Sequence, residues 1–95
     1  MKVCDLVEAY IAYRRSLGEK YQSPAVMLRS FARYIGEDKE CMSIDEKTCT
    51  AFLYSPNNTV SASWFLRYSS LKWMFEWAIV RGYMQEVVLP KEKPK

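Results

Sequence analysis

Three glycines limit this chain to short helices joined by turns. Gly18, Gly36 and Gly82 are its only glycines, and each follows a segment whose apolar residues recur every three or four positions. Glycine adopts a positive φ without steric cost, so it is common at the position just past a helix. The spacing therefore predicts helices that end beside these glycines. The alternation of β-branched and polar residues that is typical of strands does not occur, and we expect an all-α fold.

The first two helices have clear starting signals. Residues 6–17 form the first candidate helix, with Asp5 as its N-cap. Ser23 is placed to cap the second helix, and Pro24 suits its first position because the missing N–H of proline costs nothing there. This second helix is expected to end near residue 35.

Two further helices are expected in the second half of the chain. Ser43, followed by a glutamate three residues later, is a capping-box start for a short helix that reaches residue 54. The turn-forming residues at 55–58 then interrupt the chain. The fourth helix begins between residues 59 and 63 and continues to residue 81, which makes it the longest.

Helical spacing selects one face of each helix for the core. The residues on these faces are Leu6, Val7, Tyr10, Tyr13, Leu17, Leu28, Phe31, Ala32, Ile35, Ile44, Thr48, Ala51, Phe52, Trp64, Tyr68, Leu71, Phe75, Ala78 and Ile79. The fourth helix is also apolar away from this face, at Phe65, Leu66, Trp73, Met74 and Trp77. Such a helix is either central in the bundle or partly covered by another protein surface.

The composition argues against a catalytic site. The chain contains no histidine, which removes the commonest general base and the commonest metal ligand. No set of residues suited to acid–base, metal or phosphate-loop chemistry can be assembled, so we expect no catalytic residues, no cofactor and no metal. The formal net charge of +3 could help to attract a phosphate backbone, but it is common among other proteins and decides nothing.

The cysteines and the apolar segments bear on the cellular compartment. Cys4, Cys41 and Cys49 are an odd number in a chain without an export signal, so we expect reduced thiols. No apolar run approaches the roughly 20 residues that cross a bilayer. The first residues also lack the apolar stretch of a signal peptide. We therefore expect a cytoplasmic protein that does not contact membranes.

Length and C-terminal composition indicate the domain organisation. A chain of 95 residues is long enough for one hydrophobic core and too short for two. We expect a single domain over residues 1–88. Residues 89–95 are rich in lysine and proline, too charged to pack, and are expected to begin a linker to another domain.

Two groups of residues together resemble a known family. The first group spans the first two helices: Tyr10, Arg14, Arg15, Leu17, Gly18, Lys20, Leu28, Phe31, Tyr34 and Ile35. The second group spans the fourth helix and the residues after it: Ser63, Leu71, Lys72, Met74, Phe75, Gly82, Tyr83, Met84 and Pro90. In order and spacing they resemble the N-terminal core-binding domain of tyrosine recombinases, the phage-integrase-like family.

The resemblance implies a SAM-like, four-helix orthogonal bundle that forms one arm of a C-shaped clamp. The catalytic residues of this family lie in a separate C-terminal domain. The chain is therefore expected to be no enzyme itself, but a DNA-binding domain for site-specific DNA recombination or integration. The implied partners are double-stranded DNA, the C-terminal catalytic domain of the same chain and the other subunits of a recombinase tetramer on DNA.

The resemblance also points to a set of DNA-facing residues. They are Arg14, Arg15, Lys20, Gln22, Ser23, Arg29, Ser63, Arg67 and Ser70. Guanidinium groups match phosphate geometry, and donors at the start of a helix can converge on one phosphate. Other interpretations stay open. The paired arginines also suit the negative end of the first helix, Ser23 also suits a cap, and the polar face of the fourth helix also suits bare solvent.

A second function is compatible with the same sequence. The chain could be a helical protein–protein interaction module without DNA binding, which the apolar surplus of the fourth helix and the low net charge favour. A helix-turn-helix regulator fits poorly, because the long fourth helix after the 55–58 turn is no short recognition helix.

Overall fold

The computed structural model describes residues 1–36, 38–54 and 62–89, with Ala62 and Ser63 described by their backbone alone. Its elements are α1 (Val3–Ser16), α2 (Gln22–Ile35), the short 3-10 helix η1 (Cys41–Ser43), α3 (Glu46–Tyr54) and α4 (Ala62–Val80). Within these described ranges there is no strand, only an isolated antiparallel bridge between Lys2 and Glu40. The predicted all-α fold is confirmed.

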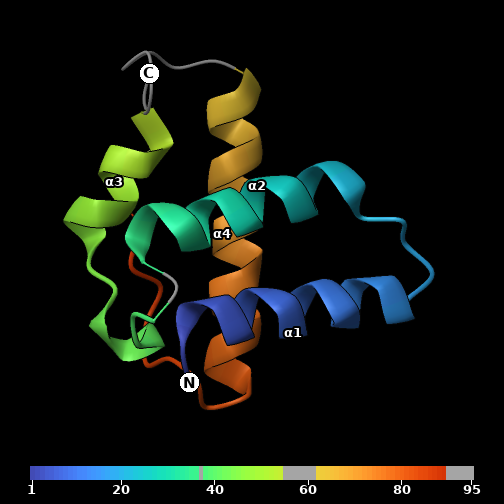
Figure 1. The fold of residues 1–95 in the computed structure, drawn as a ribbon, viewed down its shortest axis with the longest axis horizontal. Helices are drawn as coiled ribbons and strands as arrows, with labels where there is room; N and C mark the ends of the chain where they lie inside the picture. The colour runs from blue at the N-terminus through green and yellow to red at the C-terminus, as the bar shows by residue number, and fades with distance from the viewer. Residues whose placement is uncertain (37, 55–61, 90–95) are drawn as a thin grey trace.

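The helices are arranged around α4. α1 and α2 lie side by side and run in opposite directions, and α4 crosses behind both of them at a steep angle (Figure 1). α3 packs against α2 and α4 at one end of the molecule, and the connection between α1 and α2 lies at the other end (Figure 1). Because three helices contact α4, it carries apolar residues on more than one face.

A single hydrophobic core fills the space where the helices meet. Its largest fully buried side chains are Trp64, Tyr10, Phe31, Phe75, Leu6, Ile11, Leu28, Leu53, Leu71 and Met74. Burial of each such side chain contributes about 1.5–3 kcal/mol to stability. The predicted inward positions of Leu17 and Ala51 are wrong, since both are exposed. Met74, which was placed off the core face, is buried because α4 is enclosed from several sides.

α1 begins earlier than the sequence predicts because a long-range contact fixes its start. The backbone N–H of Val3 donates to the carbonyl of Lys39 at 2.7 Å, and the N–H of Cys41 donates to the carbonyl of Met1 at 2.9 Å. The helix therefore starts at Val3, and Asp5 lies inside its first turn instead of at the N-cap. Tertiary pairing takes the place of a local cap.

The predicted caps of the next two helices are also wrong. α2 begins directly after Tyr21, so Ser23 lies within the first turn and does not cap it. At α3, the carboxylate of Asp45 accepts a hydrogen bond from the backbone N–H of Thr48 at 2.7 Å. Asp45 is therefore the cap, and Ser43 belongs to η1.

The helices end just before glycines, as predicted. Gly36, with φ of 115°, directly follows α2, and Gly82, with φ of 81°, follows α4. The N–H of Gly82 donates to the carbonyl of Ile79 at 3.0 Å, which satisfies a carbonyl of the last turn of α4. The left-handed conformation at these positions explains the need for glycine.

The packed part of the chain extends past the predicted domain boundary. Leu89 is only 4% exposed and joins the core, so the expectation that a linker starts at this residue is wrong. The rest of that expectation, for residues 90–95, lies outside the described residues. No helix in the described ranges is both long enough and apolar enough to cross a bilayer.

Candidate nucleic-acid interface

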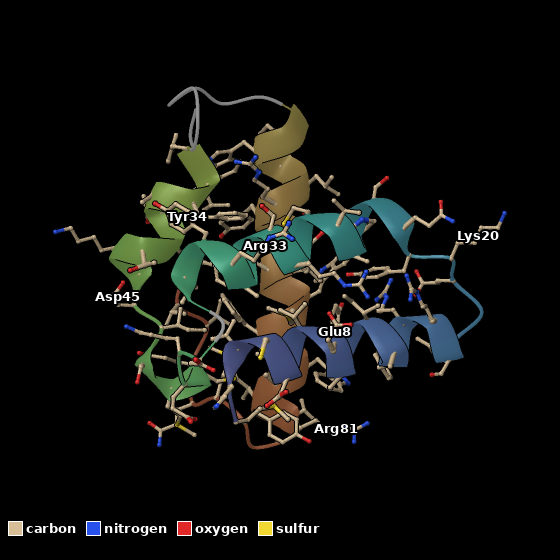
Figure 2. All side chains as sticks on the ribbon, in the orientation of Figure 1. Glu8, Lys20, Arg33, Tyr34, Asp45 and Arg81 are labelled. Carbon is tan, nitrogen blue, oxygen red and sulfur yellow. The ribbon has the colours of Figure 1, made fainter. Side chains whose placement is uncertain are left out.

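An open groove lies between the α1–α2 connection and one face of α4, with a volume of about 760 Å³. It brings together five of the residues that were predicted to face DNA: Arg14, Lys20, Gln22, Ser23 and Ser70. Lys20 marks this end of the molecule, and Asp45 lies at the opposite end (Figure 2). Residues from distant parts of the sequence therefore share one concave surface.

Arg14 forms part of the wall of the groove. Its Nη2 donates to Oε1 of Glu19 at 2.7 Å, and its Nε lies 2.7 Å from Oε2 of the same carboxylate. The guanidinium carbon also lies 5.3 Å from the ring centroid of Tyr21 and 5.8 Å from that of Trp73. The hydrogen bond with Glu19 raises the pKa of Arg14 above its ordinary value. Its charge is thus already paired within the protein.

Lys20 carries the positive charge that the groove presents to solvent, and Arg15, which was also predicted to face DNA, lies beside Lys20 but does not line the groove. Both side chains are exposed. The Nε of Arg15 donates to the carbonyl of Lys20 at 3.4 Å, which leaves the remaining guanidinium N–H groups for other partners. The ammonium group of Lys20 makes no ion pair with any residue in the described ranges. Lys20 is therefore the most available cation at this site.

The N-terminus of α2 opens onto the same groove without a side-chain cap. No side chain accepts a hydrogen bond from its first turn. The backbone N–H groups of Gln22 and Ser23 belong to this turn, and helix geometry gives them no intrahelical acceptor. Both side chains are exposed. Together with the positive end of the helix dipole, these donors form an anion-binding arrangement.

Tyr21 holds this helix start in an unusual conformation. Its backbone is left-handed, with φ of 51° and ψ of 45°, which costs a non-glycine residue about 1 kcal/mol or more. Its ring packs edge-on against Tyr10 at 5.9 Å between centroids. Burial raises the pKa of Tyr21 above its ordinary value. The packed ring therefore fixes the direction in which α2 starts.

The polar face predicted on α4 is not a single exposed strip. Ser70 is only 4% exposed, and the prediction of an exposed position for it is wrong. Arg67 turns toward α3, where its Nη1 donates to the carbonyl of Phe52 at 3.0 Å and its guanidinium lies 5.0 Å from the Phe52 ring centroid. The side chain of Ser63 lies outside the described part. Of these residues, Ser70 lines the groove and Arg67 does not.

Arg29 lies away from the groove. Its Nε and Nη2 each donate to the carboxylate of Glu8 at 2.9 Å. Glu8, which is labelled in Figure 2, is on α1 and Arg29 is on α2, so the pair joins the two helices. The hydrogen bond from Arg29 holds the pKa of Glu8 below its ordinary value. Arg29 therefore stabilises the contact between α1 and α2 and does not belong to the candidate interface.

Two aromatic residues of the groove were not predicted as site residues. Phe65 is 45% exposed and Trp73 is 51% exposed, and both line the groove. The sequence signal was their position off the core face of the fourth helix. That signal shows surplus apolar surface, but it does not reveal that the surface faces the start of α2.

The described ranges contain no group of three or more histidine, cysteine, aspartate or glutamate side chains that could hold a metal ion. Cys41 and Cys49 are buried and Cys4 is partly exposed. Comparison of the chain with protein-family models, with curated proteins and with solved structures finds no match.

Proposed function

We propose that this chain is a DNA-binding domain, the core-binding arm of a tyrosine recombinase, with the SAM-like orthogonal arrangement of that family. In this proposal it clamps duplex DNA while a separate catalytic domain of the same protein exchanges the strands. The observation that carries the proposal is the meeting of Lys20 with the uncapped N-terminus of α2 at one groove.

The physical chemistry of this corner suits a DNA phosphate. Lys20 supplies a full positive charge, and the backbone N–H groups of Gln22 and Ser23 supply donors at the positive end of a helix. The exposed guanidinium of Arg15 adds charge beside them. Contacts of this kind grip the backbone and carry little sequence information, so binding should be largely independent of sequence.

The assignment to a recombinase rests on the sequence resemblance. Its apolar members include Leu28, Phe31 and Phe75, which are fully buried, and its cationic members include Lys20 at the groove. The same residues thus divide into a core set and an exposed set, as a DNA-gripping arm requires. A parent protein whose catalytic region lacks the family's Arg, His-x-x-Arg and Tyr arrangement would contradict this assignment without touching the DNA-binding proposal.

Fluorescence anisotropy with a labelled generic duplex tests DNA binding directly. We expect weak binding at about 50 mM salt that is lost steeply toward 200 mM, as counterion release requires. The Lys20→Ala variant should weaken binding to all sequences and lower the salt slope by about one.

Lys47→Ala is the matched control, because Lys47 is an exposed lysine on α3, far from the groove. It should bind as the unaltered chain does, apart from the small effect of net charge. Absence of binding at low salt, or equal losses in the Lys20 and Lys47 variants, would overturn the proposal.

A second candidate function is supported by the apolar surface of α4. Phe65, Leu66, Trp73 and Val80 are all more than 40% exposed, and the value for Val80 is 85%. Surfaces of this kind suit protein partners. A helical protein-interaction module would show no DNA binding even at low salt, so the same titration separates the two functions.

A further inference from the structure

We propose that the groove between the α1–α2 connection and α4 holds an unpaired nucleotide, with its base against the aromatic side chains of α4 and its phosphate at the start of α2. This inference rests on the proposed function in that it assigns a more specific ligand to the same groove. Fully paired duplex would contact only the outer, cationic edge. An unpaired nucleotide, in contrast, would enter the groove itself.

The aromatic side of the groove offers an exposed ring with open space beside it. Phe65, Ser69 and Trp73 follow one another at four-residue intervals and so share one face of α4. Eight helical positions separate the backbones of Phe65 and Trp73 by about 12 Å along the axis. The residue between them is a serine, whose small side chain leaves room for a flat ring. The exposed surface of Trp73, about half of its total, is available for stacking.

Trp73 is held in place before any ligand arrives. The guanidinium of Arg14 lies 5.8 Å from the Trp73 ring centroid, and Glu19 fixes that guanidinium through contacts of 2.7 Å. A cation held near an aromatic ring favours its orientation. A preorganised ring loses less conformational entropy when a base stacks on it. Arg14 and Glu19 therefore act as positioning residues for the aromatic side.

The polar side of the groove also offers a hydroxyl group that is free to bind a ligand. The side chain of Ser70 lines the groove, and the residue is only 4% exposed. Among the hydrogen bonds within the described ranges, none involves its hydroxyl. The oxygen of this hydroxyl is not among the fully enclosed polar atoms without a partner, so it can be reached from the groove by a hydrogen-bond partner. A polar ligand in the groove, near the free N–H groups of Gln22 and Ser23, would supply one.

A nucleotide fits this combination better than an apolar peptide. Its phosphate matches Lys20 and the helix N-terminus, and its base matches Trp73 and Phe65. An apolar helix would cover the aromatic residues but leave those donors and the ammonium group without partners. In a fully paired duplex both faces of each base are covered by neighbouring pairs, so Trp73 can stack only on a base that has left the helix.

The test compares three labelled DNA probes with the 95-residue chain. They are a fully paired duplex, the same duplex with a central thymine bulge, and oligothymidine. We expect the bulged duplex to bind more tightly than the paired one. Trp73→Ala should weaken binding to the bulged duplex and to oligothymidine by on the order of tenfold. Trp73→Phe should retain most of the affinity, and Ser69→Met should lower it by filling the space between the rings.

Val80→Ala is the matched control, because Val80 is a more exposed apolar residue of α4 that does not line the groove. Circular dichroism establishes that each variant is folded. The inference is overturned if the bulged duplex binds no more tightly than the paired one, or if Trp73→Ala weakens the binding of both duplexes equally. It is also overturned if an acidic amphipathic peptide displaces oligothymidine and binds the protein more tightly than oligothymidine does. Loss of paired-duplex binding alone would overturn the clamp function, while Trp73-dependent binding of oligothymidine would still support the nucleotide site.

Discussion

The guanidinium of Arg29 donates two hydrogen bonds to the carboxylate of Glu8, each 2.9 Å long, and so ties α2 to α1. The pair is partly exposed, with side-chain exposures of 43% for Arg29 and 57% for Glu8. Solvent therefore screens it, and its contribution to stability is small. Its bidentate geometry still fixes how the two helices meet beside the core.

The Glu8 carboxylate should make stability depend on pH in the acid range. Because Arg29 lowers the pKa of Glu8 in the folded state, the pair stabilises the fold above the ordinary glutamate pKa of about 4.3 and loses this effect as the pH falls through the lower folded value. Thermal unfolding followed by circular dichroism should show Glu8→Gln melting below the unaltered chain at neutral pH. The two should converge in strong acid.

Glu86→Gln, an exposed change after α4, controls for the loss of one negative charge. It should not reproduce the pattern. A difference between the Glu8 variant and the unaltered chain that persists unchanged in strong acid would mean that packing, and not the ion pair, is responsible.

Arg67 should behave as a structural residue rather than as a DNA contact. It joins α4 to α3 through the carbonyl of Phe52 at 3.0 Å, and it also lies over the Phe52 ring. Arg67→Ala should lower the free energy of unfolding by about 1–2 kcal/mol, the usual range for a hydrogen bond from a charged donor and a cation–π contact. Urea denaturation measures this change. Lys72→Ala, at an exposed position of the same helix, should have little effect.

DNA affinity separates the two roles of Arg67 under conditions in which the variant is folded. A structural residue leaves the affinity near that of the unaltered chain. Strong loss of affinity with an unchanged urea midpoint would show that Arg67 faces the DNA, as the family resemblance implies.

The buried thiols should be protected from reagents and should weaken the fold at high pH. Burial raises the pKa of Cys49 to about 12, and it also raises the pKa of Cys41. The unfolded chain releases these protons near the ordinary cysteine pKa of about 8.5, so the free energy of unfolding should fall as the pH rises from there toward 12. With a thiol-specific chromogenic reagent near neutral pH, Cys4 should react first.

A Cys4→Ser variant is the decisive comparison for the thiol prediction. Its two remaining thiols should react only as fast as the protein unfolds, and urea should expose both. A rapid reaction in the folded variant would contradict the burial of Cys41 and Cys49.

The ends of helices could be predicted from the sequence, whereas their starts could not. Gly36 and Gly82 act through their own backbone conformation, which is a local property that the sequence displays. The start of α1 depends on the hydrogen bond between Val3 and Lys39, which are far apart in the chain. A local capping pattern cannot reveal such a pairing, so Asp5 was assigned a role that the tertiary structure fills.

The candidate site was predictable only where its residues are neighbours in sequence. Lys20, Gln22 and Ser23 adjoin one helix start, and they do share one surface. Their meeting with Trp73 depends on the angle at which α4 crosses α1 and α2, and no local pattern encodes that angle. The pairing of Arg29 with Glu8 is equally hidden, so an arginine that looks free in sequence proves to be engaged.

Glu19 should restrain DNA binding, because among the residues that the structure describes it is the one carboxylate that lines the groove. It neutralises Arg14 and lies next to Lys20 in sequence. Glu19→Gln removes this negative charge. Unit charges about 7 Å apart in water interact by roughly 0.6 kcal/mol, so affinity for duplex should rise about threefold at low salt. Screening should erase the gain as the salt concentration increases.

Glu46→Gln makes the same change of net charge on α3, at the end of the molecule that Asp45 marks in Figure 2. Its effect on duplex binding should be smaller, because distance and salt both weaken it. If Glu19→Gln instead lowered the affinity, the carboxylate would be holding Arg14 in position for a phosphate. Arg14→Lys would then bind poorly as well, since lysine keeps the charge but cannot make the bidentate contact or stack as broadly on Trp73. If Glu19→Gln binds duplex more tightly and Arg14→Lys binds it almost unchanged, the phosphate binds at Lys20 and the start of α2. Arg14 then serves only as part of the wall of the groove.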